Sequence, residues 1–144
     1  MATILVVDDH DMVRYLLVDY LQEAGYTVVA AKNGGQALQR VREQPIHVML
    51  LDMNMPGRHG LDTIRRIRAL YPDLATRIIL MSGDYPAIGE DAMEELTLLA
   101  GAHAIAYKPF NLTHLLALIR EQEQLTGFTN RHTFYLPLEH RCHS

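Results

Sequence analysis

The stretch Ile4-Leu5-Val6-Val7-Asp8-Asp9 decides the fold, because a short, β-branched apolar run here ends abruptly in two acidic residues. A run of this kind predicts a buried strand. Apolar residues from Met12 to Ala24 then recur at helical spacing, and Gly25 follows where a helix commonly ends in the left-handed conformation. The beginning of the chain therefore predicts one strand followed by one helix.

The same alternation continues to about residue 125. The further predicted strands are Thr27–Ala31, His47–Leu51, Arg77–Met81 and Ala104–Tyr107. The further predicted helices are Gly35–Glu43, Leu61–Leu70, Ile88–Ala100 and a last one that starts after Asn111 as its N-cap. Strict alternation requires parallel strands joined by right-handed crossovers, with helices on both sheet faces. We therefore predict an α/β fold with a doubly wound, five-stranded parallel sheet.

The composition is that of one soluble domain. The chain has 144 residues, of which 49% are hydrophobic and 21% charged, and its formal net charge is -4. Without a long basic run it is a poor candidate for binding nucleic acid. No apolar run approaches the ~18 residues that cross a bilayer, and no basic region precedes Ile4 as in a signal peptide. The single cysteine, Cys142, fits a reducing compartment, so we expect the protein in the cytoplasm.

Residues 126–144 break the pattern, with Gly127, Pro137 and scattered aromatic residues but no helical periodicity. We therefore predict one domain over residues 1–125 and a partly disordered tail over residues 126–144. A short strand at Thr133–Leu136, or docking of this segment on a neighbour, is the alternative. A soft-metal site at His140, Cys142 and His143 is disfavoured by their tight spacing within such a tail.

Polar residues stand at the carboxyl ends of four predicted strands, which is where doubly wound sheets carry their sites. Asp8 and Asp9 end the first strand, Asp52 the third, Ser82 the fourth and Lys108 the fifth. Three neighbouring carboxylates repel each other, and a hard divalent cation such as Mg²⁺ relieves that repulsion. A carboxylate, a metal, a fixed cation and a hydroxyl are what phosphoryl transfer to oxygen requires, with Asp52 as the nucleophile.

Each of these residues also has an ordinary interpretation. An aspartate after a strand is often a turn former, Ser82 alone would be a loop serine, and Lys108 alone a surface lysine. Their joint placement at one edge of the sheet makes chance a poor explanation. Asn33-Gly34-Gly35 looks like part of a nucleotide-binding loop, but it does not follow the first strand and is better interpreted as a helix start.

At these positions the sequence closely resembles the response-regulator receiver family of bacterial two-component systems, over about residues 2–125. The motifs stand in the family's order. They are Ile4-Leu5-Val6-Val7-Asp8-Asp9, Leu51-Asp52-Met53-Asn54-Met55-Pro56 with Gly60 after it, Leu80-Met81-Ser82-Gly83, and Tyr107-Lys108-Pro109-Phe110. The resemblance is to single-domain, chemotaxis-regulator-like members, and it implies a flavodoxin-like sheet with strand order 2-1-3-4-5.

The resemblance also implies a role for each site residue. Asp52 would accept a phosphoryl group from a sensor histidine kinase or a phosphotransfer protein. Asp8, Asp9, Asp52 and the backbone carbonyl of Asn54 would hold Mg²⁺, Asp8 mainly through a bound water. Lys108 would pair with Asp52 and then with the phosphoryl group, and Ser82 would turn inward to hydrogen-bond it. The output would be contact with an unidentified downstream protein, and homodimer formation stays open.

The sequence departs from the family pattern at two places. Ile105 stands where many members carry an aromatic switch residue, and Tyr107 lies on the same strand face two residues on. The interval between Ser82 and Lys108 is also longer than usual, and we place the extra residues in Gly83–Asp91. The positions that tune phosphate lifetime in the family are Asn54 and Asp84 here, which predicts a short-lived phosphate.

Two other function classes compete with a switch that catalyses only its own phosphorylation and dephosphorylation. A phosphohydrolase with an aspartyl nucleophile would need a second acid two residues later, and Asn54 stands there instead. A module that only docks partners is disfavoured by the complete acidic site.

Overall fold

The computed structural model describes residues 2–53, 60–83, 95, 101–108 and 111–125. Its strands are β1 (Thr3–Val7), β2 (Thr27–Ala31), β3 (Val48–Asp52), β4 (Arg77–Ser82) and β5 (Ala104–Tyr107). Its helices are α1 (Asp11–Glu23), α2 (Gly34–Glu43), α3 (Gly60–Leu70) and α6 (Leu112–Leu125). No helix within these described residues is both long and apolar enough to span a membrane.

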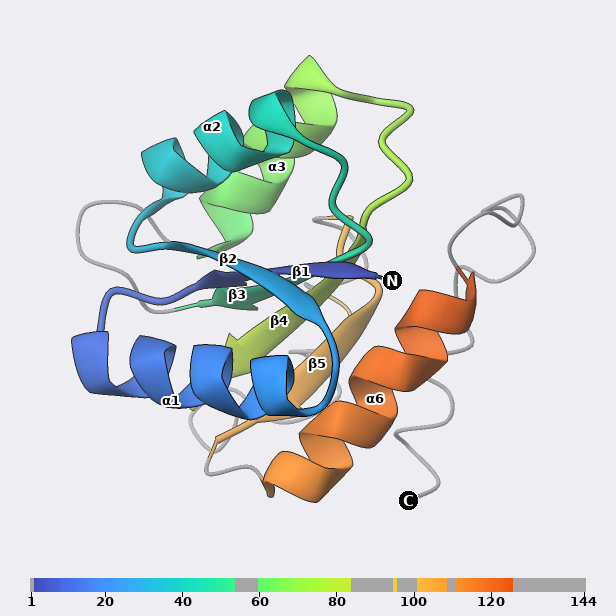
Figure 1. Cartoon of the computed structure of the whole chain (residues 1–144). Helices are drawn as coiled ribbons and strands as arrows, with labels where there is room; N and C mark the ends of the chain where they lie inside the picture. The colour runs from blue at the N-terminus through green and yellow to red at the C-terminus, as the bar shows by residue number, and fades with distance from the viewer. Residues whose placement is uncertain (1, 54–59, 84–94, 96–100, 109–110, 126–144) are drawn as a thin grey trace.

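The five strands form one parallel sheet in the order β2-β1-β3-β4-β5, which confirms the predicted fold. Helices α2 and α3 cover one face of the sheet, and α1 and α6 cover the other (Figure 1). Every residue of β3 and β4 is buried, as a strand enclosed on both faces must be. The outer strand β2 is only partly buried.

Each face of the sheet has its own apolar core, because neighbouring strand residues point to opposite faces. Leu5 and Leu51 lie in the core beneath α2 and α3, whereas Val6 and Leu50 lie in the core beneath α1 and α6. Helix α3 contributes Ile64 to the first core. The continuous apolar strands are thus explained by burial on both sides.

The predicted element bounds agree with the structure to within about a residue. Strand β3 begins at Val48, one residue later than predicted, and just before it the His47 ring Nδ1 accepts from the Thr3 N–H at 2.9 Å. Gly25 follows the last residues of α1 with a φ of 102°, as its place in the sequence predicted. Of the predicted helix Ile88–Ala100 only Glu95 is described, and it is helical.

Helix α2 begins where the Asn-Gly-Gly segment predicted a helix start. The Asn33 side chain accepts from the Gln36 N–H at 2.8 Å, and the Gln36 side chain accepts from the Lys32 N–H at 3.0 Å. This reciprocal pair satisfies two backbone donors at the start of the helix. The segment therefore has a structural role as a helix cap.

Candidate functional site

The sheet register brings the predicted site residues to one edge. Asp8 and Asp9 follow β1, Asp52 and Ser82 are the last residues of β3 and β4, and Lys108 follows β5. In the register, Val7 pairs with Leu51, Asp52 with Met81, and Ser82 with Tyr107. The strands therefore end within about one residue of each other, which brings these five residues to the same edge of the sheet.

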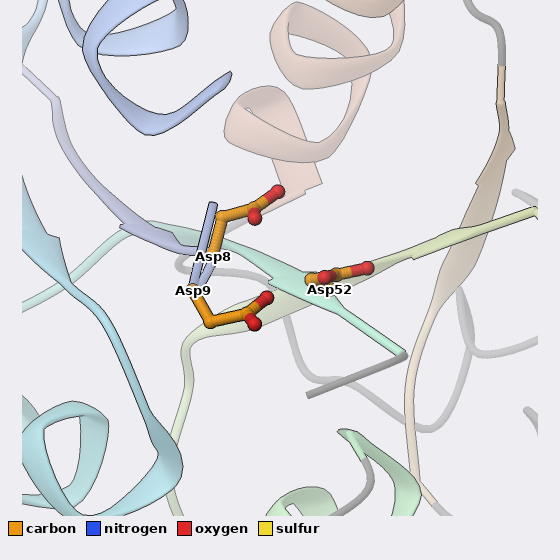
Figure 2. A group of neighbouring side chains, drawn as sticks. All are labelled: Asp8, Asp9 and Asp52. Atoms are coloured by element: carbon orange, nitrogen blue, oxygen red, sulfur yellow. The ribbon is translucent and has the colours of Figure 1, made fainter. Parts of the chain in front are cut away.

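The carboxylates of Asp8, Asp9 and Asp52 form a compact cluster. One oxygen from each lies within 4.8 Å of the others, and Figure 2 shows the three side chains gathered in one small region. Asp8 is fully buried, Asp52 is 3% exposed and Asp9 is exposed. Two carboxylates of the cluster are thus buried, and the third faces solvent.

Lys108 supplies the positive charge nearest to this cluster. Its Nζ donates a hydrogen bond to Asp52 Oδ1 at 2.9 Å and lies 3.9 Å from Asp8 Oδ2. The backbone holds the lysine in place, since the Lys108 N–H donates to the Ser82 carbonyl at 2.8 Å. One ammonium among three carboxylates leaves a net negative charge at the site.

The backbone around Asp8 is firmly held. Its Oδ1 accepts from the His10 N–H at 2.9 Å, and its own N–H donates to the Ala31 carbonyl at 3.1 Å. Burial raises the pKa of the Asp8 carboxyl, and the hydrogen bond from His10 opposes this rise. Among the nearby charges, Asp52 raises the pKa further, Lys108 lowers it, and Asp9 raises it by a smaller amount. Asp8 is therefore a carboxylate whose charged form needs a further cation.

These carboxylates fit a hard divalent cation such as Mg²⁺. Asp8 Oδ2 is buried and has no hydrogen-bond partner, although a buried polar atom normally has one. Three carboxylates within reach of one ion, one of them open to solvent for bound waters, suit Mg²⁺, which retains part of its water shell. The fourth predicted ligand, the Asn54 carbonyl, lies outside the described residues, as does Asp84.

Ser82 and the residues of β5 lie beside the cluster. Ser82 is fully buried at the end of β4. Ile105 is buried in the core beneath α2 and α3, and the half-buried Tyr107 packs against that same core. The position of the family's aromatic switch is therefore filled by an aliphatic side chain, with a tyrosine two residues on along the same face.

One residue that supports the site, Arg14, could not be recognised from the sequence. Arg14 on α1 is mostly buried, and its Nη1 donates to the Asp8 carbonyl at 2.8 Å, while its Nη2 pairs with Asp11. His10 caps α1, because its Nδ1 accepts from the Val13 N–H. The i,i+3 spacing of Asp11 and Arg14 was the only sequence signal, and it also occurs on ordinary helix surfaces.

Gly60 packs tightly beneath Asp52. A Cβ at this position would lie 2.6 Å from the Asp52 carbonyl oxygen and 2.9 Å from Met53 Cα. Its N–H also donates to the Met53 carbonyl at 2.9 Å. Close backbone approach, not a left-handed φ, is therefore the reason for glycine here, since among the described residues only Gly25 and Gly101 have a positive φ.

Comparison with known proteins identifies the family. The model of the response regulator receiver domain matches residues 4–120. Chemotaxis protein CheY of Bacillus subtilis is 33% identical over 119 residues, covering 82% of this chain and 94% of that protein. Response regulator RR06 of Streptococcus pneumoniae is 32% identical over 117 residues, but there this chain spans only 51% of the relative's length.

Solved structures agree. Chemotaxis protein CheY4 of Vibrio cholerae superposes with a TM-score of 0.76 at 28% identity, covering 84% of this chain and 98% of that one. A CheY-like receiver domain protein from Methanospirillum hungatei gives a TM-score of 0.77 at 25% identity, covering 88% and 96%. With its matching model, relatives and sheet order, this chain belongs to the response regulator receiver domain family of two-component systems.

Proposed function

We propose that this domain is a phosphorylation switch in which Asp52 accepts a phosphoryl group from a phosphohistidine on a sensor histidine kinase or a phosphotransfer protein. The observation that carries the proposal is the hydrogen bond of 2.9 Å between Lys108 Nζ and Asp52 Oδ1, made beside the carboxylates of Asp8 and Asp9. An aspartate with a fixed cation and further acids at one strand edge is equipped for phosphoryl transfer.

In the transfer, a carboxylate oxygen of Asp52 attacks phosphorus as the P–N bond of the phosphohistidine breaks. The leaving imidazole keeps the bonding electron pair and takes up a proton. Lys108 then moves its hydrogen bond from Asp52 to a phosphoryl oxygen, so that the new negative charge keeps a cation. The Ser82 hydroxyl donates to another phosphoryl oxygen, which draws the end of β4 toward the site.

Asp8, Asp9 and Asp52 would hold Mg²⁺, with the backbone carbonyl of Asn54 as a further ligand. Receiver domains of this family bind Mg²⁺ through acidic residues. When bound, the ion supplies charge neutralisation for the phosphoryl oxygens. The buried Oδ2 of Asp8, which lacks a hydrogen-bond partner, supports this assignment.

Phosphorylation would signal by repacking a protein-binding face, since drawing in Ser82 moves the end of β4 beside β5. The readers of that face are a downstream protein of unknown identity or a second copy of the chain, in the cytoplasm. The domain would catalyse only its own phosphorylation and dephosphorylation. Asn54 and Asp84 would help orient water for dephosphorylation, which gives a short-lived phosphate.

The first test is the intact mass of the protein after incubation with Mg²⁺ and acetyl phosphate. We expect one added phosphate on the wild type, none on Asp52→Asn, and one on the matched control Asp19→Asn, which makes the same change at an exposed acid on α1. The time course after removal of donor gives the phosphate lifetime.

Two results would count against the proposal. An unphosphorylated wild type with Mg²⁺ present favours a module that only docks partners, and phosphate on Asp52→Asn places the acceptor elsewhere. A phosphate that persists for many hours contradicts the lifetime assigned to Asn54 and Asp84.

A further inference from the structure

A buried arginine lies at the opposite edge of the sheet from Asp52. Arg77 is the first residue of β4, and it is fully buried. Its Nε donates to Gln122 Oε1 on α6 at 3.0 Å. Gln122 is fully buried as well, so the contact joins β4 to the last part of α6 within the protein interior.

The remaining donors of this pair have no acceptor. Arg77 Nη1, Arg77 Nη2 and Gln122 Nε2 are buried side-chain nitrogens without a hydrogen-bond partner. All three lie close together, because Gln122 Nε2 is bonded to the same carbon as the oxygen that Arg77 contacts. Buried polar groups are normally paired, but within the part of the chain that the structure describes these three donors have no acceptor.

One side of Arg77 is lined by the apolar core beneath α1 and α6. Ile79, two residues after Arg77 on β4, belongs to the core beneath α1 and α6. Val48, which pairs with Arg77 from β3, belongs to that core as well. Ile119, one helical turn before Gln122, completes this side. An unpaired charge in such a setting is unfavourable, because it has lost its water without gaining a counter-ion.

A second positive charge, that of Arg68, lies near Arg77. Arg68 on α3 donates to the carbonyls of Gly101 and Leu74. Burial lowers the pKa of Arg77 to about 10, and the positive charge of Arg68 contributes to this shift. Arg77 therefore remains protonated at neutral pH. Among the described residues neither arginine forms an ion pair with a carboxylate, so a positive charge stays unbalanced at this edge.

We propose that Arg77 and Gln122 bind one small inorganic anion, of the size of chloride, between β4 and α6. An anion can accept from all three unpartnered nitrogens and neutralise the guanidinium, whereas a water molecule has only two lone pairs and carries no charge. The ligand is small because both side chains are fully buried. It enters when the last turn of α6 opens briefly, and once bound it fastens that helix to the sheet.

Thermal unfolding in sodium chloride and in sodium gluconate, compared at equal ionic strength, tests the proposal. Gluconate is too large for the site. A specific ligand of the folded state raises the midpoint, by about 4 °C at ten times its dissociation constant, and the effect saturates. We expect this chloride response in the wild type and its loss in Arg77→Met. The control Arg65→Met removes an exposed arginine of α3 and should keep the response.

A crystal grown in sodium bromide gives a second measurement that needs no variant. The proposal predicts an anomalous bromide peak in contact with Arg77 Nη atoms and Gln122 Nε2. Ordered water without anomalous signal at that place overturns it. So does a wild type with equal midpoints in the two salts, or an Arg77→Met protein that keeps the full chloride response.

Discussion

At the scale of the residue, Gly60 shows how closely the backbone is packed around Asp52. Because an added methyl group would lie 2.6 Å from the Asp52 carbonyl oxygen, Gly60→Ala must displace the strand end that carries the carboxylate. We expect a loss of about 2 kcal/mol in the free energy of unfolding, as for other overpacked positions. Phosphorylation by acetyl phosphate should slow as well.

Urea denaturation of Gly60→Ala and Gly35→Ala checks this explanation. Gly35 lies in α2, where an added Cβ would meet only Asn33 Oδ1, at 3.4 Å, so this control should stay within about 0.5 kcal/mol of the wild type or exceed it. Equal stability of the two variants would show that the close approach at Gly60 is readily relieved.

The sequence predicted that Asp8, Asp9 and Asp52 lie together, because the carboxyl ends of parallel strands lie at the same edge of a sheet. It did not reveal Arg14 beneath Asp8, nor the contact between Arg77 and Gln122, which lie 45 positions apart. Such contacts depend on side-chain rotamers and on how helices lie across the sheet. Neither leaves a periodic trace in the sequence.

At the scale of the element, the strands were predictable because each is a short apolar run between turn-forming residues. His103, just before β5, shows what such a pattern leaves out. It is buried, and its Nδ1 accepts from the Ile78 N–H at 3.0 Å, which fastens the start of β5 to β4. Its ring is therefore neutral, with its proton on Nε2.

This buried ring gives the fold a dependence on pH. Burial, with smaller effects from Arg77 and Arg68, lowers the His103 pKa from 6.5 to about 2. Above pH 6.5 the ring is neutral in the folded and the unfolded state, so the free energy of unfolding has its full value. Below it only the unfolded chain binds the proton, so stability falls by about 1.4 kcal/mol per pH unit.

Urea denaturation at pH 7 and pH 5 measures this dependence. Between these values we expect the wild type to lose about 2 kcal/mol more than His103→Asn, whose amide oxygen can still accept from Ile78. The exposed His114→Asn serves as the control and should follow the wild type. An identical loss in all three proteins would mean that His103 is protonated in the folded state.

At the scale of the whole molecule, the carboxylates of Asp8, Asp9 and Asp52 repel one another, and a bound cation would reduce that repulsion. Three carboxylates face one lysine there, and two of the acids are buried. We therefore expect millimolar Mg²⁺ to raise the thermal midpoint of the wild type by a few degrees, because the ion binds the folded state alone. The exposed Asp9 offers a variant, Asp9→Asn, that removes one of the proposed ligands without disturbing the core.

Differential scanning calorimetry with and without Mg²⁺ checks this expectation. Asp9→Asn should lose most of the Mg²⁺ response, and Asp19→Asn should keep it. A full response in Asp9→Asn would exclude its carboxylate from the ligand set. Chloride is held constant in these scans, so that the anion site proposed at Arg77 does not contribute.

The contact between Asp52 and Lys108 joins residues 56 positions apart, and this spacing has a consequence for biosynthesis. A ribosome delivers all three acids of the cluster long before the lysine, since β1 and β3 precede β5 along the chain. While the chain is still emerging, the acids at the ends of its early strands therefore lack Lys108 as a partner. On the proposed function, the pairing of Asp52 with Lys108 would form only when the last strand docks, so a half-made polypeptide would not accept phosphate.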